Sequence, residues 1–346
     1  MPFVFPVRRL LAAAALVAAL TSCAEAPPPP PVAPPPIPSV SLSPRVIEQA
    51  AAYRHYVNNA SAIQPGFMDG GQVAQGVRVG AAFEPQQLLR GAIAYGAVVA
   101  LQDPGFVASV RTYATDPTQR RTIAYEIMKD PAYVVGIAGS AGAAGLVIQA
   151  LGDDGHKLLS QGKRVKQAAY DVQRASWSKA DVAGRDARLQ LAKQLSVTPV
   201  NGDVAETTRL SQAVVGAAPL GILAPQTVSP PYTPLVIRSM AVAALAALGY
   251  ADDASLEQVM PILAEPNAAL CLKMSKLNLY QCLAVSKPHY EDVFCLGVHA
   301  LMDAGKCVLK STGVPEPIDV ATQPLALATT SAAVPVSATP TKPMTR

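Results

Sequence analysis

The sequence has few of the residues and motifs that enzymes commonly use. The chain of 346 residues has only four histidines and one tryptophan, so paired acid and base side chains are scarce. It has no HExxH, P-loop, GxGxxG or CxxCH motif, and Gly139-Ser140-Ala141-Gly142 is not the GxSxG turn of a serine hydrolase. Asp153-Asp154 lacks the remaining oxygen ligands of a calcium loop. A non-enzymatic role is therefore favoured, and catalysis by scattered carboxylates such as Glu126 and Glu257 is the alternative.

The chain also lacks a strong excess of either charge. Its 28 Lys and Arg residues against 24 Asp and Glu residues give +4, and removal of Arg8 and Arg9 with a signal peptide leaves +2. This charge is too small to argue for nucleic-acid binding. Half of the residues are hydrophobic but only 5% are aromatic, which predicts a core of small side chains in closely packed, alanine-rich helices.

The N-terminus has the pattern of a signal peptide. The first nine residues carry Arg8 and Arg9 and no acidic residue, and residues 10–20 are all Leu, Ala or Val. Eleven helical residues rise only about 16 Å, roughly half the thickness of a bilayer's hydrocarbon core. We therefore predict that residues 1–22 are cleaved rather than kept as a membrane span.

Leu20-Thr21-Ser22-Cys23 follows and resembles the lipobox of bacterial lipoproteins. The resemblance implies that diacylglycerol is attached to the thiol of Cys23, that the chain is cleaved before it, and that the new amino group is acylated. Several acyl chains give stable anchoring to a membrane. In the Gram-negative members an Asp after the cysteine favours inner-membrane retention, and this chain has Ala24. The expected location is the outer membrane, facing the periplasm.

Two low-complexity segments flank the predicted body. Nine of the twelve residues from 27 to 38 are proline, which predicts an extended spacer over residues 23–43. At about 3.1 Å per residue, residues 24–43 would reach roughly 60 Å from the bilayer. Residues 315–346 have no aromatic side chain and only two acidic ones, which predicts a disordered tail. The folded domain is expected over residues 44–314.

Repeated capping signals predict that this domain is an all-α, multi-helix bundle. Asp103-Pro104, Asp116-Pro117 and Asp130-Pro131 recur at spacings of 13 and 14 residues, and Glu84-Pro85 precedes them. Each pair combines a helix N-cap with the proline favoured at the first helical position. Helix repeats are an alternative arrangement. Residues 67–83, which contain Gly70-Gly71, are expected to form a loop or a short strand pair.

The segment 132–151 has no charged residue and has glycine at positions 136, 139, 142 and 145. It is long enough to span a membrane, but it has few large apolar residues, so a tightly packed central helix of the body is favoured. Residues 153–193 are polar. Their His156, Lys163, Arg164 and Lys166 are interpreted as part of a solvated helix face, with a patch for anionic lipid or polysaccharide as the alternative. Three later helices are expected at residues 204–215, 233–249 and 253–263.

Four further cysteines lie between Cys271 and Cys307. An even number in an exported chain argues for two disulfides, with three possible pairings. Pairing Cys271 with Cys307 and Cys282 with Cys295 centres both pairs on Pro288, where a helical hairpin would turn. The step from Cys271 to Cys282 is close to three helical turns, but the twelve-residue step from Cys295 to Cys307 is less well phased. The nested pairing is therefore favoured, and the others stay open.

The cysteine pattern is similar to the twin-cysteine helical hairpins of the CHCH type, which use slightly shorter spacings. The similarity covers about 37 residues and implies an architecture rather than an activity. His289 and His299 lie among the cysteines, but the cysteine pairs two to four residues apart that are typical of zinc sites are missing. We expect no metal and no cofactor.

As a whole, the chain resembles an uncharacterised envelope lipoprotein. The favoured hypothesis is a structural or interaction module that docks an envelope protein or a cell-wall component. The alternative hypothesis is an envelope enzyme that acts on peptidoglycan or polysaccharide. A broad exposed apolar patch would favour the module, and a cleft with a close carboxylate pair of raised pKa would favour the enzyme.

Overall fold

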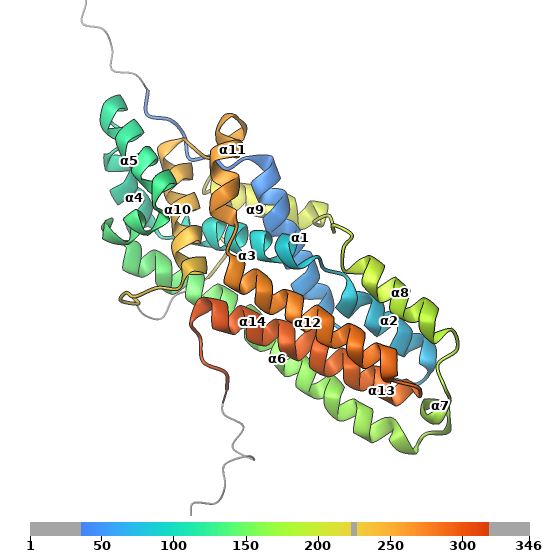
Figure 1. The fold of residues 1–346 in the computed structure, drawn as a ribbon. Coiled ribbons are helices and arrows are strands. Elements are labelled where there is room, and N and C mark those ends of the chain that lie inside the picture. Colours follow the sequence, from blue (N-terminus) through green and yellow to red (C-terminus); the bar gives the residue numbers. More distant parts are fainter. Residues whose placement is uncertain (1–35, 223–226, 318–346) are drawn as a thin grey trace, which may run out of the picture. The chain divides into compact units, whose positions relative to one another are not determined.

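The computed structural model describes residues 36–222 and 227–317. The predicted signal peptide, Cys23, the proline-rich segment up to residue 35 and the predicted tail from residue 318 lie outside the described residues. The described part is all-α, as predicted, and it contains no β-strand (Figure 1). Its first half contains α1 (Pro44–Ser61), α2 (Gly70–Ala81), α3 (Pro85–Ala100), α4 (Pro104–Thr112), α5 (Pro117–Lys129), the 3₁₀ helix η1 (Pro131–Gly136) and α6 (Ser140–Asp171).

The second half begins with short elements and ends in a helical hairpin. It contains η2 (Val172–Arg174), α7 (Ser176–Lys179), α8 (Arg185–Leu195), α9 (Val204–Val214), α10 (Pro234–Leu248), η3 (Asp253–Ser255), α11 (Leu256–Val259), η4 (Met260–Leu263), α12 (Pro266–Val285), α13 (His289–Cys295), the π-helical segment η5 (Leu296–Met302) and α14 (Asp303–Thr312).

The predicted capping signals are confirmed. The side chains of Glu84, Asp103, Asp116 and Asp130 each accept hydrogen bonds from backbone N–H groups in the first turn of α3, α4, α5 and η1. Glu265 caps α12 in the same way. These bonds satisfy N–H groups that have no partner within the helix, so each acidic residue followed by proline fixes a helix start locally.

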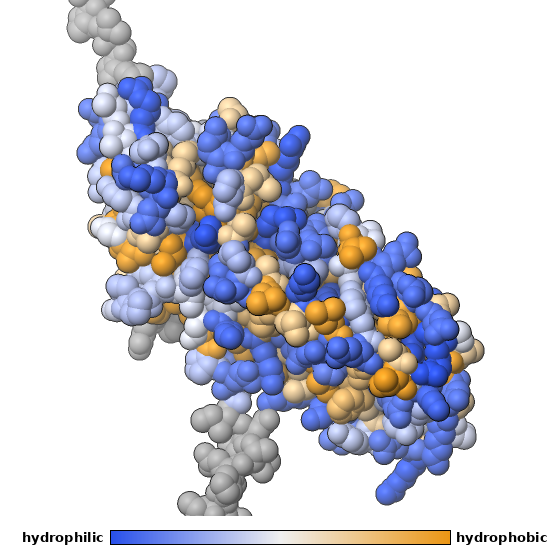
Figure 2. Space-filling model, in the orientation of Figure 1, coloured by the Kyte–Doolittle hydropathy of each residue, from blue (hydrophilic) through white to orange (hydrophobic). Residues whose placement is uncertain are grey.

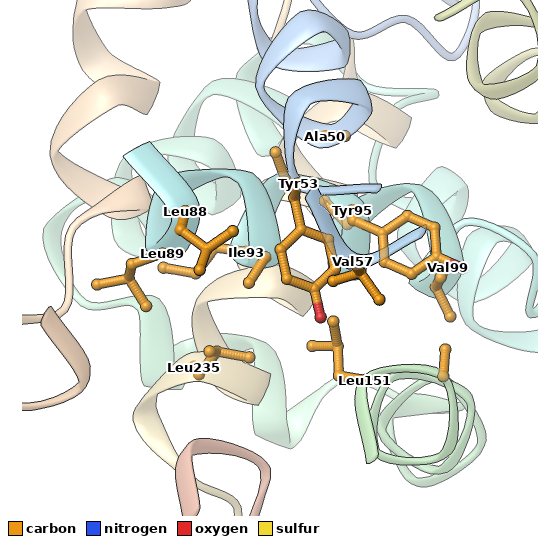
Figure 3. Packing of buried hydrophobic residues seen from close by; sticks show 14 of the residues in the cluster. Ala50, Tyr53, Val57, Leu88, Leu89, Ile93, Tyr95, Val99, Leu151 and Leu235 are labelled. Atoms are coloured by element: carbon orange, nitrogen blue, oxygen red, sulfur yellow. The ribbon is translucent and has the colours of Figure 1, made fainter. Parts of the chain in front are cut away.

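The centre of the bundle is formed by α3 and α10, whose side chains are buried almost throughout. Helix α3 packs against α1, α6 and α10. Figure 3 shows Tyr53 of α1 between Ile93 and Val57, with its ring turned toward Leu151 of α6. A Cβ at Gly91 of α3 would lie 2.5 Å from the carbonyl oxygen of Gln49, so glycine is what allows α1 and α3 to approach this closely.

Helix α6 is the long support of the C-terminal hairpin, and α6, α12 and α14 run side by side in Figure 1. Glycines bring these backbones together on both sides of the contact. A Cβ at Gly162 of α6 would lie 2.6 Å from the backbone nitrogen of Met302, and a Cβ at Gly305 of α14 would lie 2.7 Å from the backbone nitrogen of Leu159. The hairpin is thus held by backbone proximity as well as by disulfides.

The hairpin is stapled by two nested disulfides, as predicted. The outer bridge joins Cys271 to Cys307 and the inner bridge joins Cys282 to Cys295, with Cα–Cα distances of 5.7 and 5.6 Å. The step from Cys295 to Cys307 is one residue longer than the step from Cys271 to Cys282. A π-turn takes up one additional residue per turn, and η5 lies between Cys295 and Cys307. The π segment therefore corrects the phase mismatch seen in the sequence.

Several local predictions are wrong. Residues 70–81 form the regular helix α2, capped by Asp69, rather than a loop or strand pair. Residues 132–151 are not one helix, because η1 ends at Gly136 and α6 starts only after Gly139, which has a φ of 83°. The helix expected over 253–263 is divided among η3, α11 and η4, with Pro261 in the last of these.

The predicted spacer merges with the body before residue 43. The backbone N–H groups of Ser41 and Ser43 donate to the carbonyl oxygens of Ala246 and Ala251, at 3.3 and 2.6 Å. Arg111 donates to the carbonyl oxygen of Pro38 at 3.0 Å, and the side chains of Leu42 and Ser43 are buried. Residues 38–43 therefore add nothing to the reach of a spacer.

No individual helix among the described residues has both the length and the apolar character to cross a membrane. Helices α3 and α4 reach that length only together, and they meet at an angle of 86°. Most of α3 is buried in the body.

Candidate functional site

The carboxylates named from the sequence do not form a site. Glu126 on α5 is paired with Lys129 at 3.9 Å, and Glu257 is exposed on the short helix α11. Neither of them lines the two cavities described below. Cys23 lies outside the described residues, and the other four cysteines are all used in the disulfides.

A network of buried and partly buried charges joins α1, α6 and α9. One guanidinium nitrogen of Arg54 donates to both carboxylate oxygens of Asp154, at 2.7 and 2.6 Å. Glu206 lies 3.6 Å from Nε of Arg54 and accepts bonds from Arg209 at 2.7 and 2.9 Å. A guanidinium thus stands between the two carboxylates. Because each carboxylate has its own cation, the network serves to join three helices rather than to carry out acid–base chemistry.

The predicted basic segment of α6 has a mixed rather than a purely basic surface. His156, Lys163 and Lys166 are half-buried, and Arg164 is exposed. Arg164 donates to the side-chain oxygen of Gln161. Asp153 and Asp171 lie among the exposed residues of the same helix. This arrangement agrees with the interpretation as a solvated helix face.

The tip of the hairpin is clamped by two arginines of α8. Arg185 donates through Nε to the carbonyl oxygen of Ser286 at 2.8 Å and through Nη2 to that of Ala284 at 3.1 Å, and Arg188 donates to the carbonyl oxygen of Leu283. These carbonyls end α12 and have no partner within the helix. Cations at a helix C-terminus are also stabilised by its dipole. Helix α8 therefore caps α12 across the fold.

Asp292 holds this clamp in place. Its carboxylate accepts a hydrogen bond from Ser286 at 2.7 Å and forms an ion pair with Arg188. Burial raises the pKa of Asp292, and the Ser286 hydroxyl and the Arg188 guanidinium offset part of this rise. No second carboxylate contacts it in the part of the chain that the structure describes, so it is not the close carboxylate pair that would favour an enzyme.

Beside the clamp is a cavity of about 410 Å³, which we call the tip cavity. It lies between α2, α8, residues 181–184 and the start of α13. Its walls are mostly apolar, with charged or polar side chains at Arg78, Asp181, Arg188, His289 and Asp292. The His289 ring packs on Gly70, where a Cβ would collide with it, and lies 6.3 Å from the Trp177 ring.

A second cavity, of about 520 Å³, lies along α12 and contains a buried lysine. The side chain of Lys276 is 3% exposed. Its ammonium nitrogen donates to the carbonyl oxygen of Ala81 at 2.6 Å and lies 3.4 Å from the centre of the Phe83 ring. Burial lowers the pKa of Lys276 well below its ordinary value of 10.5, and the charge of Glu84 partly offsets this effect. We call this cavity the Lys276 pocket.

The outer face of α12 carries a row of exposed apolar side chains next to this pocket. Leu270, Met274 and Leu277 are 58%, 47% and 40% exposed, and the exposed residues Gln281, which is polar, and Ala284 continue the same spacing. The spacing of four, three, four and three residues is that of a coiled-coil seam. Figure 2 shows hydrophobic residues over α12 on this face, bordered by hydrophilic ones. We call these five residues the α12 stripe.

The sequence contains part of the signal for the stripe. The four-three spacing of Leu270, Met274 and Leu277 can be read directly, but the sequence does not tell which face of α12 is buried. The tip cavity has no such signal, because its walls come from residues that are more than two hundred positions apart. Among the residues that the structure describes, no cluster of three or more His, Cys, Asp or Glu could hold a metal ion.

Comparison of the chain with protein-family models, with curated proteins and with solved structures finds no match.

Proposed function

We propose that this protein is a lipoprotein of the cell envelope that acts as an interaction module, anchored through Cys23 and docking an envelope protein through the α12 stripe. The observation that carries the docking role is the row of exposed apolar side chains along one helix face. Contiguous exposed apolar surface is unusual on a soluble protein and marks interaction sites. The anchor rests on the sequence pattern that ends at Cys23.

The partner that best fits the stripe is an amphipathic helix with acidic flanks. The four-three spacing suits a helix packed along α12. Helix α12 has no acidic residue in its twenty positions, and Lys273 is exposed beside the stripe. A second copy of α12 would therefore bring lysine toward lysine, whereas an acidic helix would be attracted.

The hollow beside the stripe favours a protein over a bilayer surface. The Lys276 pocket has a volume of about 520 Å³ and is lined by Leu270, Leu277 and Tyr280. A flat membrane surface cannot enter such a hollow, but a protruding aromatic or aliphatic side chain can, and such anchors contribute most of the binding energy at interfaces. Enzymatic action through Glu126 and Glu257 has no comparable support.

Site-specific photocrosslinking in the native envelope tests the docking role. A photoreactive residue at Met274 is expected to crosslink to one envelope protein, and the matched position Gln167, exposed on α6, is expected not to. Leu277→Glu should abolish the Met274 crosslink while leaving the fold intact, because Leu277 is 40% exposed and surface substitutions change stability by only about 0.5 kcal/mol. Equal crosslinking at Met274 and Gln167, or no protein crosslink at Met274, would overturn the docking role.

Membrane fractionation tests the anchor separately. Cys23→Ala is expected to move the protein from the membrane fraction to the soluble periplasmic fraction and to weaken the crosslink from Met274. Unchanged membrane association of the variant would show that the anchor is wrong, whatever the result at the α12 stripe.

A further inference from the structure

The tip cavity has the size and lining of a small-ligand site that the docking role does not use. Its volume of about 410 Å³ lies within the range of about 300 to 1,000 Å³ for ligand pockets, which are mostly apolar with a few polar groups. Ala74 and Val77 of α2 form one apolar wall, and Ala187, Leu191 and Leu195 of α8 form another.

The cavity is held in a fixed shape by the elements around it. Arg188 and Asp292, which line it, form an ion pair between α8 and α13, and Arg185 next to the lining joins α8 to the hairpin. The backbone of residues 180–182 is joined to the hairpin, because Val182 donates to the carbonyl oxygen of Lys287 at 2.8 Å and His289 donates to that of Ala180 at 3.3 Å. A ligand would therefore meet a preformed cavity and lose little affinity to rearrangement of the protein.

Two opposite charges in the lining have no ion-pair partner among the described residues. The Arg188–Asp292 pair is neutral as a unit and is bonded within the fold. Arg78 and Asp181 are exposed and line the cavity. One cation and one anion without ion-pair partners, on a cavity whose walls are mostly apolar, are complementary to a ligand that carries both charges on an apolar body.

The length of the cavity along α2 limits the length of such a ligand. Gly70, on which the His289 ring packs, and Arg78 both line the cavity and lie eight residues apart on α2, about 12 Å along the helix axis. An extended chain of three residues, at about 3.3 Å each, spans about 10 Å. The cavity is therefore about as long as a tripeptide.

We propose that the tip cavity binds a short apolar peptide of about three residues with both ends free, its carboxylate at Arg78 and its ammonium group at Asp181. The apolar side chains of the peptide lie between α2 and α8. This ligand would bind apart from the α12 stripe.

Tryptophan fluorescence offers a direct readout of binding. Trp177 is the only tryptophan in the chain, and its ring lies 6.3 Å from that of His289 in the cavity lining. The mature protein is titrated with the tripeptide Ala-Leu-Ala, with its N-acetyl form and with its C-terminal amide, and the dissociation constants are checked by calorimetry. We expect the free tripeptide to bind best and each cap to weaken binding by about fivefold, since the two charges are partly exposed to solvent.

Two variants assign the two ends of the peptide. In Arg78→Gln the amide and the free acid should bind equally, and in Asp181→Asn the acetylated and the free peptide should bind equally. Arg121→Gln, which alters an exposed arginine on α5, should leave all three dissociation constants unchanged. Ala187→Phe, at an exposed position of the lining, should fill the cavity and prevent binding of every form.

Each contrary result overturns the proposal. Absence of binding by the free tripeptide, or unchanged binding in Ala187→Phe, would show that the cavity is not the site. Equal binding of the acetylated and free forms by the wild type would assign the cavity to the C-terminus of a longer chain instead of a free peptide.

Discussion

Lys276 provides the sharpest test of the interior of the protein, because it is a buried lysine of α12. We consider Lys276→Met, which keeps the length of the side chain and removes the amine. The carbonyl oxygen of Ala81 keeps one donor, the backbone N–H of Phe83 at 2.9 Å. The substitution therefore leaves no buried acceptor without a partner, and where the amine is neutral its cost is one hydrogen bond, about 1 kcal/mol.

The effect of this substitution depends on pH in a defined direction. Burial lowers the pKa of Lys276 below its ordinary value of 10.5, so the unfolded chain binds the proton more tightly than the folded protein. The free energy of unfolding of the wild type then rises with pH between the lowered pKa and 10.5, by up to about 1.4 kcal/mol per pH unit from this residue. Lys276→Met lacks this contribution, so its stability relative to the wild type should be highest at low pH and fall as the pH rises.

Urea unfolding followed by circular dichroism between about pH 7 and pH 9.5 measures this difference. The other lysines titrate in both proteins and cancel in the comparison. Lys273→Met, on the exposed face of the same helix, is the matched control. Its free energy of unfolding should depend on pH in the same way as that of the wild type. If the free energy of unfolding of Lys276→Met also showed the pH dependence of the wild type, Lys276 would have its ordinary pKa in the folded protein. The reasoning from its burial would then be refuted.

Three further predictions concern packing, charge and the hairpin. Gly162→Ala should lower the free energy of unfolding by about 1 to 3 kcal/mol, because its Cβ would lie 2.6 Å from the backbone of Met302. Gly136→Ala, where a Cβ would meet no atom within 4 Å, should change the free energy of unfolding little. Equal effects of the two substitutions in urea unfolding would contradict this packing. Arg54→Met should lower the free energy of unfolding by about 3 to 5 kcal/mol, because it leaves Asp154 without its main cation. A decrease below about 1 kcal/mol, measured by calorimetry, would show that this ion pair is no stronger than one at the surface. Replacing both cysteines of the outer bridge by serine should lower the free energy of unfolding by about 4 kcal/mol, and replacing those of the inner bridge by about 3 kcal/mol, since their loops span 36 and 13 residues. The reverse order in urea unfolding would argue against an explanation by loop entropy.

The parts of the fold that follow from local chemistry were predictable. An Asp or Glu before a proline satisfies N–H groups at a helix start whatever the helix packs against, so the starts of α3, α4 and α5 could be derived from the sequence. The nested bridges were predictable because both cysteine pairs are centred on the turn at Pro288.

The errors occurred where tertiary packing decides the local structure. Helix α2 contains Gly70, Gly71, Gly76 and Gly80, and glycine disfavours helix on its own. In the fold these glycines make room for neighbours, since a Cβ at Gly80 would lie 2.6 Å from the side chain of Leu296. Conversely, the uncharged segment 132–151 has the composition of one continuous helix, but the backbone turns at Gly139, where a Cβ would lie 2.6 Å from the backbone nitrogen of Phe106.

The candidate sites were less predictable than the fold. The spacing of the α12 stripe is present in the sequence, but its exposure depends on which helices cover α12. The tip cavity depends on α2, α8 and α13 meeting, and no local pattern reports that. Lys276 looks like an ordinary helical lysine until Ala81 and Phe83 are placed around it.

The helices of the hairpin also keep apart the cysteines that are consecutive in the sequence. Along the chain, the first two thiols are Cys271 and Cys282, eleven residues apart. Once α12 has formed, they are separated by about 16 Å, far beyond the limit of about 7 Å between Cα atoms of a disulfide. The same holds for Cys295 and Cys307, twelve residues apart on the other arm. Once these helices have formed, consecutive cysteines can no longer pair, and the antiparallel turn at Pro288 leaves each cysteine a single partner within reach.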